Sequence, residues 1–210
     1  MKDVAQHIME PLNDNGVYRH LRFREPGTMC MHFDLVTWPG HLCYTGDMGT
    51  FVFTRVYDML NFFRTERRVD GTFSIDHRYW AEKCEGQDKC DGLREFDADA
   101  FKREITQQRR RLFLNYAKYM DADMRRDFWG ELEDVKRSAN DGEHATYAAV
   151  QDWSFEINKP SRWSDGNELI HIDTDDFPSC KQYTMRFLWC CQALAWGIEK
   201  YDAAKEEVPA

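Results

Sequence analysis

Between residues 17 and 54, apolar and polar side chains alternate, and this pattern constrains the fold more than any other feature of the sequence. In "YRHLRFRE", Leu21 and Phe23 share one face, whereas His20, Arg22 and Arg24 share the other. A period of two residues is typical of a β-strand with one buried face. The segment therefore predicts a strand that turns its apolar side chains toward a core.

Three further runs continue the pattern: "MCMHFDLVTW", "HLCYT" and "TFVFTR". The first of them places four apolar side chains on one face, namely Met29, Met31, Phe33 and Leu35. Between the first and second runs, "WPGH" fits a turn in which Pro39 presets φ and Gly40 supplies a positive φ. Together the runs predict an antiparallel meander of about four strands.

The stretch "GDMGT", Gly46 to Thr50, could cradle a phosphate or could only turn the chain. A phosphate loop leads into a helix N-terminus, but here the residues that follow, 51–53, are strand formers. The two glycines are what a tight hairpin requires, so the stretch predicts a turn. A second hypothesis, a nucleotide enzyme or small-ligand sensor, would use Asp47, Thr50 and Arg55 as contacts near the edge of the meander.

After Tyr57 the apolar spacing becomes helical. Helices are predicted at residues 56–64, 76–84, 97–120 with Asp97 as N-cap, 123–137, 141–153 and 179–201, where Ser179 and Gln182 form a capping box. The predicted fold class is α+β, an N-terminal meander packed against a C-terminal set of helices with a buried, apolar last helix. One domain is expected over residues 1–210, β-rich at 17–56 and helical at 57–205.

The charge balance is acidic, with a formal net charge of -9. Such a chain is repelled by nucleic acid and anionic membranes, and the charge serves either solubility or imitation of a polyanion. The longest apolar run, residues 187–198, is too short to span a bilayer. The first residues lack the apolar core of a secretory leader. The odd number of cysteines, seven, predicts buried thiols of a reducing cytoplasm rather than a disulfide framework.

Motifs for catalysis or metal binding are not found in the sequence. Cys84 and Cys90 form a C-x5-C pair, but paired CxxC-like or HxxxH-like elements are what indicate zinc. The basic stretches "FFRTERR" and "QQRRRLF" fit either nucleic-acid contact or solvated helix faces. We therefore predict no catalytic residue, no metal and no cofactor.

An acidic segment offers a candidate binding surface instead. If the chain imitates a polyanion, its carboxylates should gather on one face near residues 131–141. A partner could also contact an exposed aromatic residue in the polar loop 158–168. The candidate partner-binding residues are Glu131, Glu133, Asp134, Asp141 and Trp163.

Several blocks carry a family resemblance: His20 to Arg64 with "TWPG" and "GDMGT", "RYWAEKC", "EDVKRSANDGEH" and "FLWCCQALAWGIEKYDAAK". They resemble a family of small accessory proteins encoded in tailed-phage and prophage genomes. The resemblance implies a phage product that acts in the host cytoplasm and counters a host defence, such as CRISPR-Cas or restriction, by binding a host protein complex. It implies no catalytic residue. The alternative is a phage enzyme acting on nucleotides or nucleic acid, or a small-ligand binder.

Overall fold

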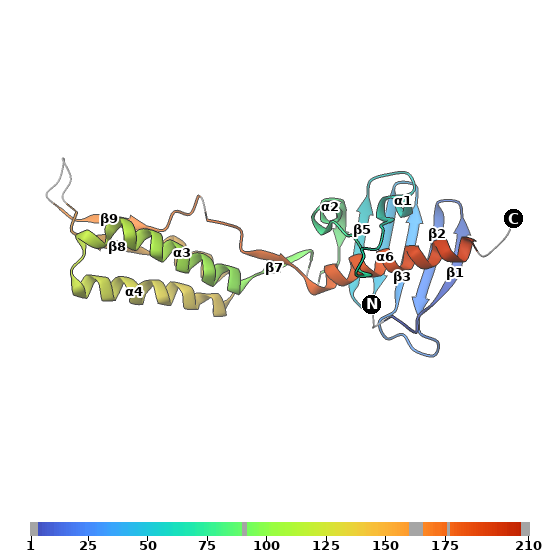
Figure 1. Cartoon of the computed structure of the whole chain (residues 1–210), viewed down its shortest axis with the longest axis horizontal. Coiled ribbons are helices and arrows are strands. Elements are labelled where there is room, and N and C mark those ends of the chain that lie inside the picture. Colours follow the sequence, from blue (N-terminus) through green and yellow to red (C-terminus); the bar gives the residue numbers. More distant parts are fainter. Residues whose placement is uncertain (1–3, 90–91, 160–165, 176, 207–210) are drawn as a thin grey trace. The chain divides into compact units, whose positions relative to one another are not determined.

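The computed structural model describes residues 4–89, 92–159, 166–175 and 177–206 (Figure 1). The chain divides into two compact units. Unit 1 combines Met1–Glu95 with Tyr183–Ala210, and unit 2 is Phe96–Gln182. Each unit has its own hydrophobic core. That both units belong to one domain stays a prediction.

Unit 1 contains a six-stranded antiparallel sheet whose strands follow one another in chain order (Figure 1). Its strands are β1 Ile8–Asn15, β2 Tyr18–Arg24, β3 Phe33–Trp38, β4 His41–Gly46, β5 Gly49–Thr54 and β6 Cys84–Gln87. The α+β class is confirmed, but the expected count of about four strands was too low. The two outer strands were missed because "IMEPLNDN" contains a proline and "CEGQ" is mostly polar, so neither alternates.

The strand predicted from Met29 begins only at Phe33. Met31 has a φ of 57°, in the left-handed region that strands do not use. The Asp47 carboxylate holds this bend, because it accepts a hydrogen bond from the Met31 amide at 2.6 Å. The turn predictions are confirmed: Gly40 has a φ of 80°, and Gly46 pairs with Gly49 across the β4–β5 hairpin.

Helix α6, Met185–Glu206, covers one face of this sheet (Figure 1). The residues that alternate inward on the strands pack against it, and Phe23 stacks on Phe33 with ring centroids 4.7 Å apart. At Gly197 the helix comes so near the sheet that an added Cβ would lie 3.2 Å from side-chain atoms of both Phe23 and Leu35. Short helices α1, Met59–Phe63, and α2, His77–Ala81, complete this core. The buried last helix is thus confirmed.

The start of that helix differs from the prediction. Residues Lys181–Tyr183 form strand β10, which pairs with β7, Arg94–Phe96. Thr184 caps the helix instead, because its hydroxyl oxygen accepts a hydrogen bond from the Phe187 amide at 3.2 Å. The capping box at Ser179 was therefore wrong: the backbone there pairs with a distant strand, which local spacing does not reveal.

Among its described residues, unit 2 is built mainly from helices and the β8–β9 hairpin. Its elements are α3 Ala98–Tyr116, η1 Ala117–Tyr119, α4 Ala122–Arg137, η2 Ser138–Asp141, α5 Glu143–Asp152, β8 Ser154–Ile157 and β9 Glu168–His171. Asp97 is confirmed as the N-cap of α3, accepting from the Ala100 amide at 2.8 Å. The helices after Tyr57 are therefore split between two cores, whereas the sequence analysis packed them all against the meander.

Substitutions at two glycines test whether the backbone packs too closely at Gly46 to admit a side chain. A Cβ on Gly46 would collide with the backbone carbonyl oxygen of His32, so we expect Gly46→Ala to cost about 1–3 kcal/mol of unfolding free energy. Gly130 lies inside α4 with open space around it, so Gly130→Ala should stabilise the protein by about 1 kcal/mol. Urea denaturation measures both changes. Equal effects of the two substitutions would contradict the close approach at Gly46.

Candidate partner-binding surface

Four carboxylates occupy one exposed face of helix α4. They stand at positions i, i+4, i+8 and i+11 and are Asp123, Asp127, Glu131 and Asp134. With 3.6 residues per turn and a 1.5 Å rise, this spacing aligns them over about 16 Å of helix. We call these four residues the acidic face of α4.

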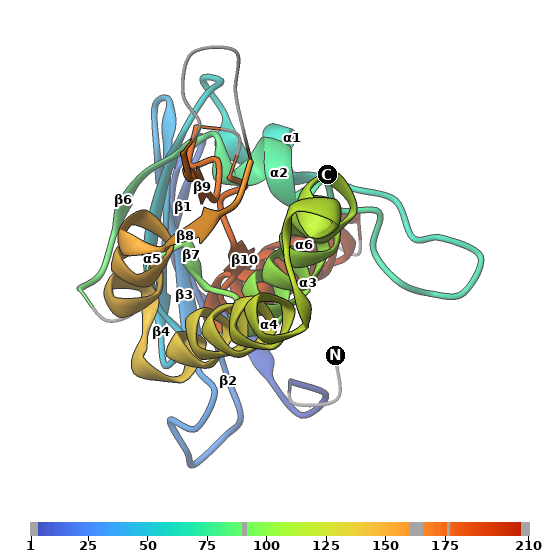
Figure 2. The same ribbon diagram turned by 90° about the vertical axis from the view of Figure 1, so that its left-hand side faces the viewer.

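The amphipathic sequence of α4 directs this face outward. Its opposite side buries Phe128, Leu132 and Val135 in the core of unit 2. Asp121 caps the helix by accepting from the amides of Asp123 and Met124 at 3.0 and 2.9 Å. In both views α4 runs beside α3 (Figures 1 and 2). The helix therefore offers its carboxylates to solvent on the side away from its core contacts.

Negative charge on this face is incompletely compensated. Desolvation raises the pKa of Glu131, and the neighbouring carboxylates of Asp127 and Asp134 raise it further. A contact with the Trp153 indole lowers this pKa but does not cancel the increase. Within the described residues, Asp127 has no ion-pair partner. A carboxylate whose ionisation is opposed by its neighbours gains from an approaching cation.

Ion pairs at the two ends of the face are exposed. Asp123 pairs with Arg126 at 3.0 Å, and Asp134 pairs with Arg137 at 2.7 Å. Both pairs are three residues apart on the helix surface, where such contacts contribute only about 0.2–0.5 kcal/mol. A partner with its own cations could replace them at small cost.

The other predicted acidic residues lie elsewhere. Glu133 points toward α3, where its carboxylate is 2.9 Å from Arg109 and 3.2 Å from Lys136. Burial opposes its ionisation, but these two cations outweigh burial and lower the pKa of Glu133. Asp141 is exposed in η2, beyond the end of α4. Trp163 lies outside the described residues.

The structure thus brings Glu131 and Asp134 together and adds Asp123 and Asp127, which sequence reasoning missed. Their spacing of four, four and three residues was visible in the sequence. The prediction of an acidic cluster near residues 131–141 included Glu133, which sits on another side of the helix and pairs with Arg109.

The three ligand contacts proposed for the meander do not converge. Asp47 and Thr50 lie at the β4–β5 turn, where the Thr50 hydroxyl is 2.9 Å from that of Thr45. Arg55 follows the other end of β5, and its amide donates to the Gly40 carbonyl at 3.3 Å. Residues 51–54 of β5 separate Thr50 from Arg55, and the Asp47 carboxylate already binds the Met31 amide. A nucleotide contact by these residues stays a prediction.

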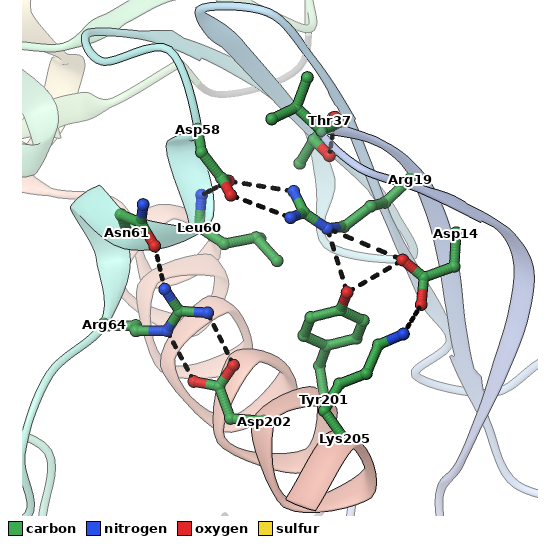
Figure 3. A network of polar contacts seen from close by, with 11 residues as sticks. Asp14, Arg19, Thr37, Asp58, Leu60, Asn61, Arg64, Tyr201, Asp202 and Lys205 are labelled. Carbon is green, nitrogen blue, oxygen red and sulfur yellow. Dashed lines mark hydrogen bonds and ion pairs between the residues drawn. The ribbon is translucent and has the colours of Figure 1, made fainter. Parts of the chain in front are cut away.

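A polar network in unit 1 is a second cluster, which no local sequence pattern predicts (Figure 3). Arg19 is only 9% exposed and donates to both carboxylate oxygens of Asp58, at 3.0 and 2.9 Å. Its Nε donates to the Tyr201 hydroxyl at 3.2 Å, and that hydroxyl donates to Asp14 at 2.9 Å. Lys205 completes the network, with its Nζ 2.6 Å from Oδ2 of Asp14.

These contacts join β1, β2, the N-cap of α1 and the last turns of α6 (Figure 3). Burial opposes the ionisation of Asp14, but hydrogen bonds from Lys205 and Tyr201 prevail and lower its pKa. Nearby, Arg64 binds Asp202 and Arg67 binds Glu199, so two arginines of "FFRTERR" anchor α6. The network is saturated by its own members, which makes it a structural clamp.

Asp34 lies on the sheet face opposite α6 and is 7% exposed. Its carboxylate accepts from Arg22 at 2.8 Å and lies 2.7 Å from Nε2 of His20. Burial alone would raise the pKa of Asp34, yet these two partners lower it below the usual 3.8. The alternation read from β2 placed His20 and Arg22 on this face, but their shared partner comes from β3.

In the described part of the chain, no three His, Cys, Asp or Glu side chains gather so that they could hold a metal ion. Cys90 of the C-x5-C pair lies outside that part, and the six cysteines within it are free thiols. No helix among the described residues is both long and apolar enough to cross a bilayer. No family model matches the chain, and no curated protein or solved structure is significantly similar to it.

Removing Arg19 tests the clamp. Arg19→Met leaves Asp58 partly buried without its cation, so we expect a loss of about 3 kcal/mol of unfolding free energy. The matched control is Arg24→Met, whose pair with Glu10 is more exposed and should cost less than about 1 kcal/mol. Guanidinium denaturation compares the two variants. Similar losses would show that Arg19 is an ordinary surface cation.

The lowered pKa of Asp34 predicts a direction for acid sensitivity. A carboxylate with a depressed folded-state pKa stabilises the protein fully above its usual pKa of 3.8, and this contribution disappears as pH falls through the lower value. Asp34→Asn should therefore lose stability at pH 7 and show a smaller further loss between pH 5 and pH 2 (roughly the window in which a paired Asp titrates). Unfolding followed at several pH values measures this. Parallel curves for the variant and the parent would contradict it.

Proposed function

We propose that this protein is a phage-encoded counter-defence protein that inhibits a host immune complex, of the CRISPR or restriction type, by binding it in the host cytoplasm. The acidic face of α4 is the contact we assign to this role. The resemblance to phage accessory proteins supports the phage origin, and the net charge of -9 supports a basic partner.

The observation that carries the proposal is the uncompensated charge around Glu131. Four carboxylates aligned on a rigid helix offer regularly spaced negative charge, and the pKa of the central one is raised partly by its neighbours. Complexes that act on nucleic acid hold its backbone in basic grooves. An acidic helix entering such a groove would pair with cations that normally meet phosphates.

This mode of binding has physical consequences. Long-range attraction between the acidic face and a basic groove should speed association, and added salt should weaken it. The remote side of α4 stays packed in its own core, so binding needs no refolding of the helix. Inhibition would follow from occupying the groove, without any chemical step by this chain.

Charge removal at the acidic face is the direct test. We expect the double variant Asp127→Asn, Glu131→Gln to lose at least about tenfold in affinity for the partner complex, because two central carboxylates are neutralised. The partner is first recovered by co-purification from a host that carries defence systems, identified by mass spectrometry and then titrated in pure form. Inhibition of its nuclease activity is measured in parallel.

The matched control is the double variant Glu25→Gln, Glu85→Gln, which removes two exposed carboxylates of unit 1. Its net charge therefore equals that of the α4 double variant. It should keep parental affinity. If both double variants weaken binding equally, overall charge rather than the acidic face is responsible. If no defence complex is recovered, the counter-defence role is wrong.

A further inference from the structure

We propose that unit 1 carries a second interaction site, independent of α4, that takes an apolar side chain from an acidic segment of a partner protein. The site is a surface depression of about 580 Å³ between the β5–α1 connection, α1 and α2. We call it the aromatic depression, and its lining residues are Val56, Tyr57, Asp58, Asn61, Phe62 and Tyr79.

Three exposed, large apolar side chains line this depression. Tyr57 is 69% exposed, Tyr79 is 41% exposed and Val56 is 40% exposed, all within one depression. Single exposed apolar residues are ordinary, but several that line one hollow indicate an interaction surface. Tyrosine is also among the residues that contribute most at protein interfaces.

The carboxylate and the amide oxygen of the lining are already engaged within unit 1. The Asp58 carboxylate binds Arg19, and the Asn61 side chain accepts from Arg64 (Figure 3). An incoming group therefore meets aromatic and aliphatic surface rather than a free carboxylate. This composition favours an apolar side chain over a polar or cationic one.

The surroundings of the depression are cationic, in contrast to the chain as a whole. Arg55 precedes Val56 and has no ion-pair partner within the described residues. Lys83 places Nζ 4.8 Å from the centroid of the Tyr79 ring, and Arg78 is largely exposed. The acidic neighbours are already held: Glu82 lies 3.5 Å from Arg78 and 3.9 Å from Lys83. Asp76 accepts from the Tyr79 amide at 3.0 Å, and Asp58 binds Arg19. Charge complementarity thus selects a segment whose apolar residue is flanked by Asp or Glu.

The depression is held in shape by contacts beneath it. The Tyr57 carbonyl accepts from the Gly40 amide at 2.9 Å. The Phe62 ring lies 5.4 Å from that of Tyr79 and 4.8 Å from that of Phe63, which is fully buried. A site shaped before binding spends less of its interaction energy on ordering.

Selection from a library of short random peptides, displayed on filamentous phage, tests the proposal on the full-length protein. We expect the selected peptides to share a Trp, Phe, Leu or Ile flanked by Asp or Glu. A synthetic copy of the most enriched peptide is then titrated by fluorescence anisotropy. Tyr57→Ser should weaken its binding at least about tenfold, and Arg55→Glu should weaken it and reduce its salt dependence.

Tyr18→Ser is the matched control, because Tyr18 is 54% exposed on β2 and outside the depression. It should bind the peptide as the parent does. Selected peptides without acidic flanks, or binding that survives Tyr57→Ser, would overturn the proposal, as would a failure to enrich any peptide. Loss of the acidic face of α4 should leave peptide binding unchanged, which separates this site from the proposed function.

Discussion

Unit 1 depends on the packing of α6 against the inner face of the sheet. The last helix of the chain supplies the apolar surface that the first strands need, and it approaches them most closely at Gly197. Aromatic rings fill the contact, with Phe33 edge-on to both Trp189 and Trp196. Because the partners are about 160 residues apart in sequence, this contact closes a long loop, and the sheet is covered only after residues 185–206 have been made.

The Arg19 network secures the same contact at the far end of α6. It ties Tyr201 and Lys205 to the first two strands and to the N-cap of α1. Its charges are matched inside the protein, so it has little to offer a partner. The acidic face of α4 is the opposite case, since Asp127 and Asp134 oppose the ionisation of Glu131 and all four carboxylates are exposed. This contrast separates charge that holds a fold together from charge that is available for binding.

Each unit therefore presents a surface of its own chemistry. Unit 2 offers aligned carboxylates on a helix, and unit 1 offers an aromatic depression with cations around it. On our two proposals, the first surface enters a basic groove and the second takes an acidic segment, so each would select a different feature of a partner. A protein that acts by occupying another complex gains specificity from such a combination.

Local patterns determined much of the secondary structure. The alternation around Leu21 and Phe23, the turns at Gly40 and Gly46, the cap at Asp97 and the apolar last helix follow from neighbouring residues and are present in the structure. The edge strands, the pairing of β7 with β10 and the division of the helices between two cores depend on contacts between residues far apart, which local spacing does not encode. The same holds for the sites. The acidic face was readable from a helical spacing of three or four residues in the sequence, whereas the partners of Arg19 and the members of the aromatic depression were decided only when the chain folded back on itself.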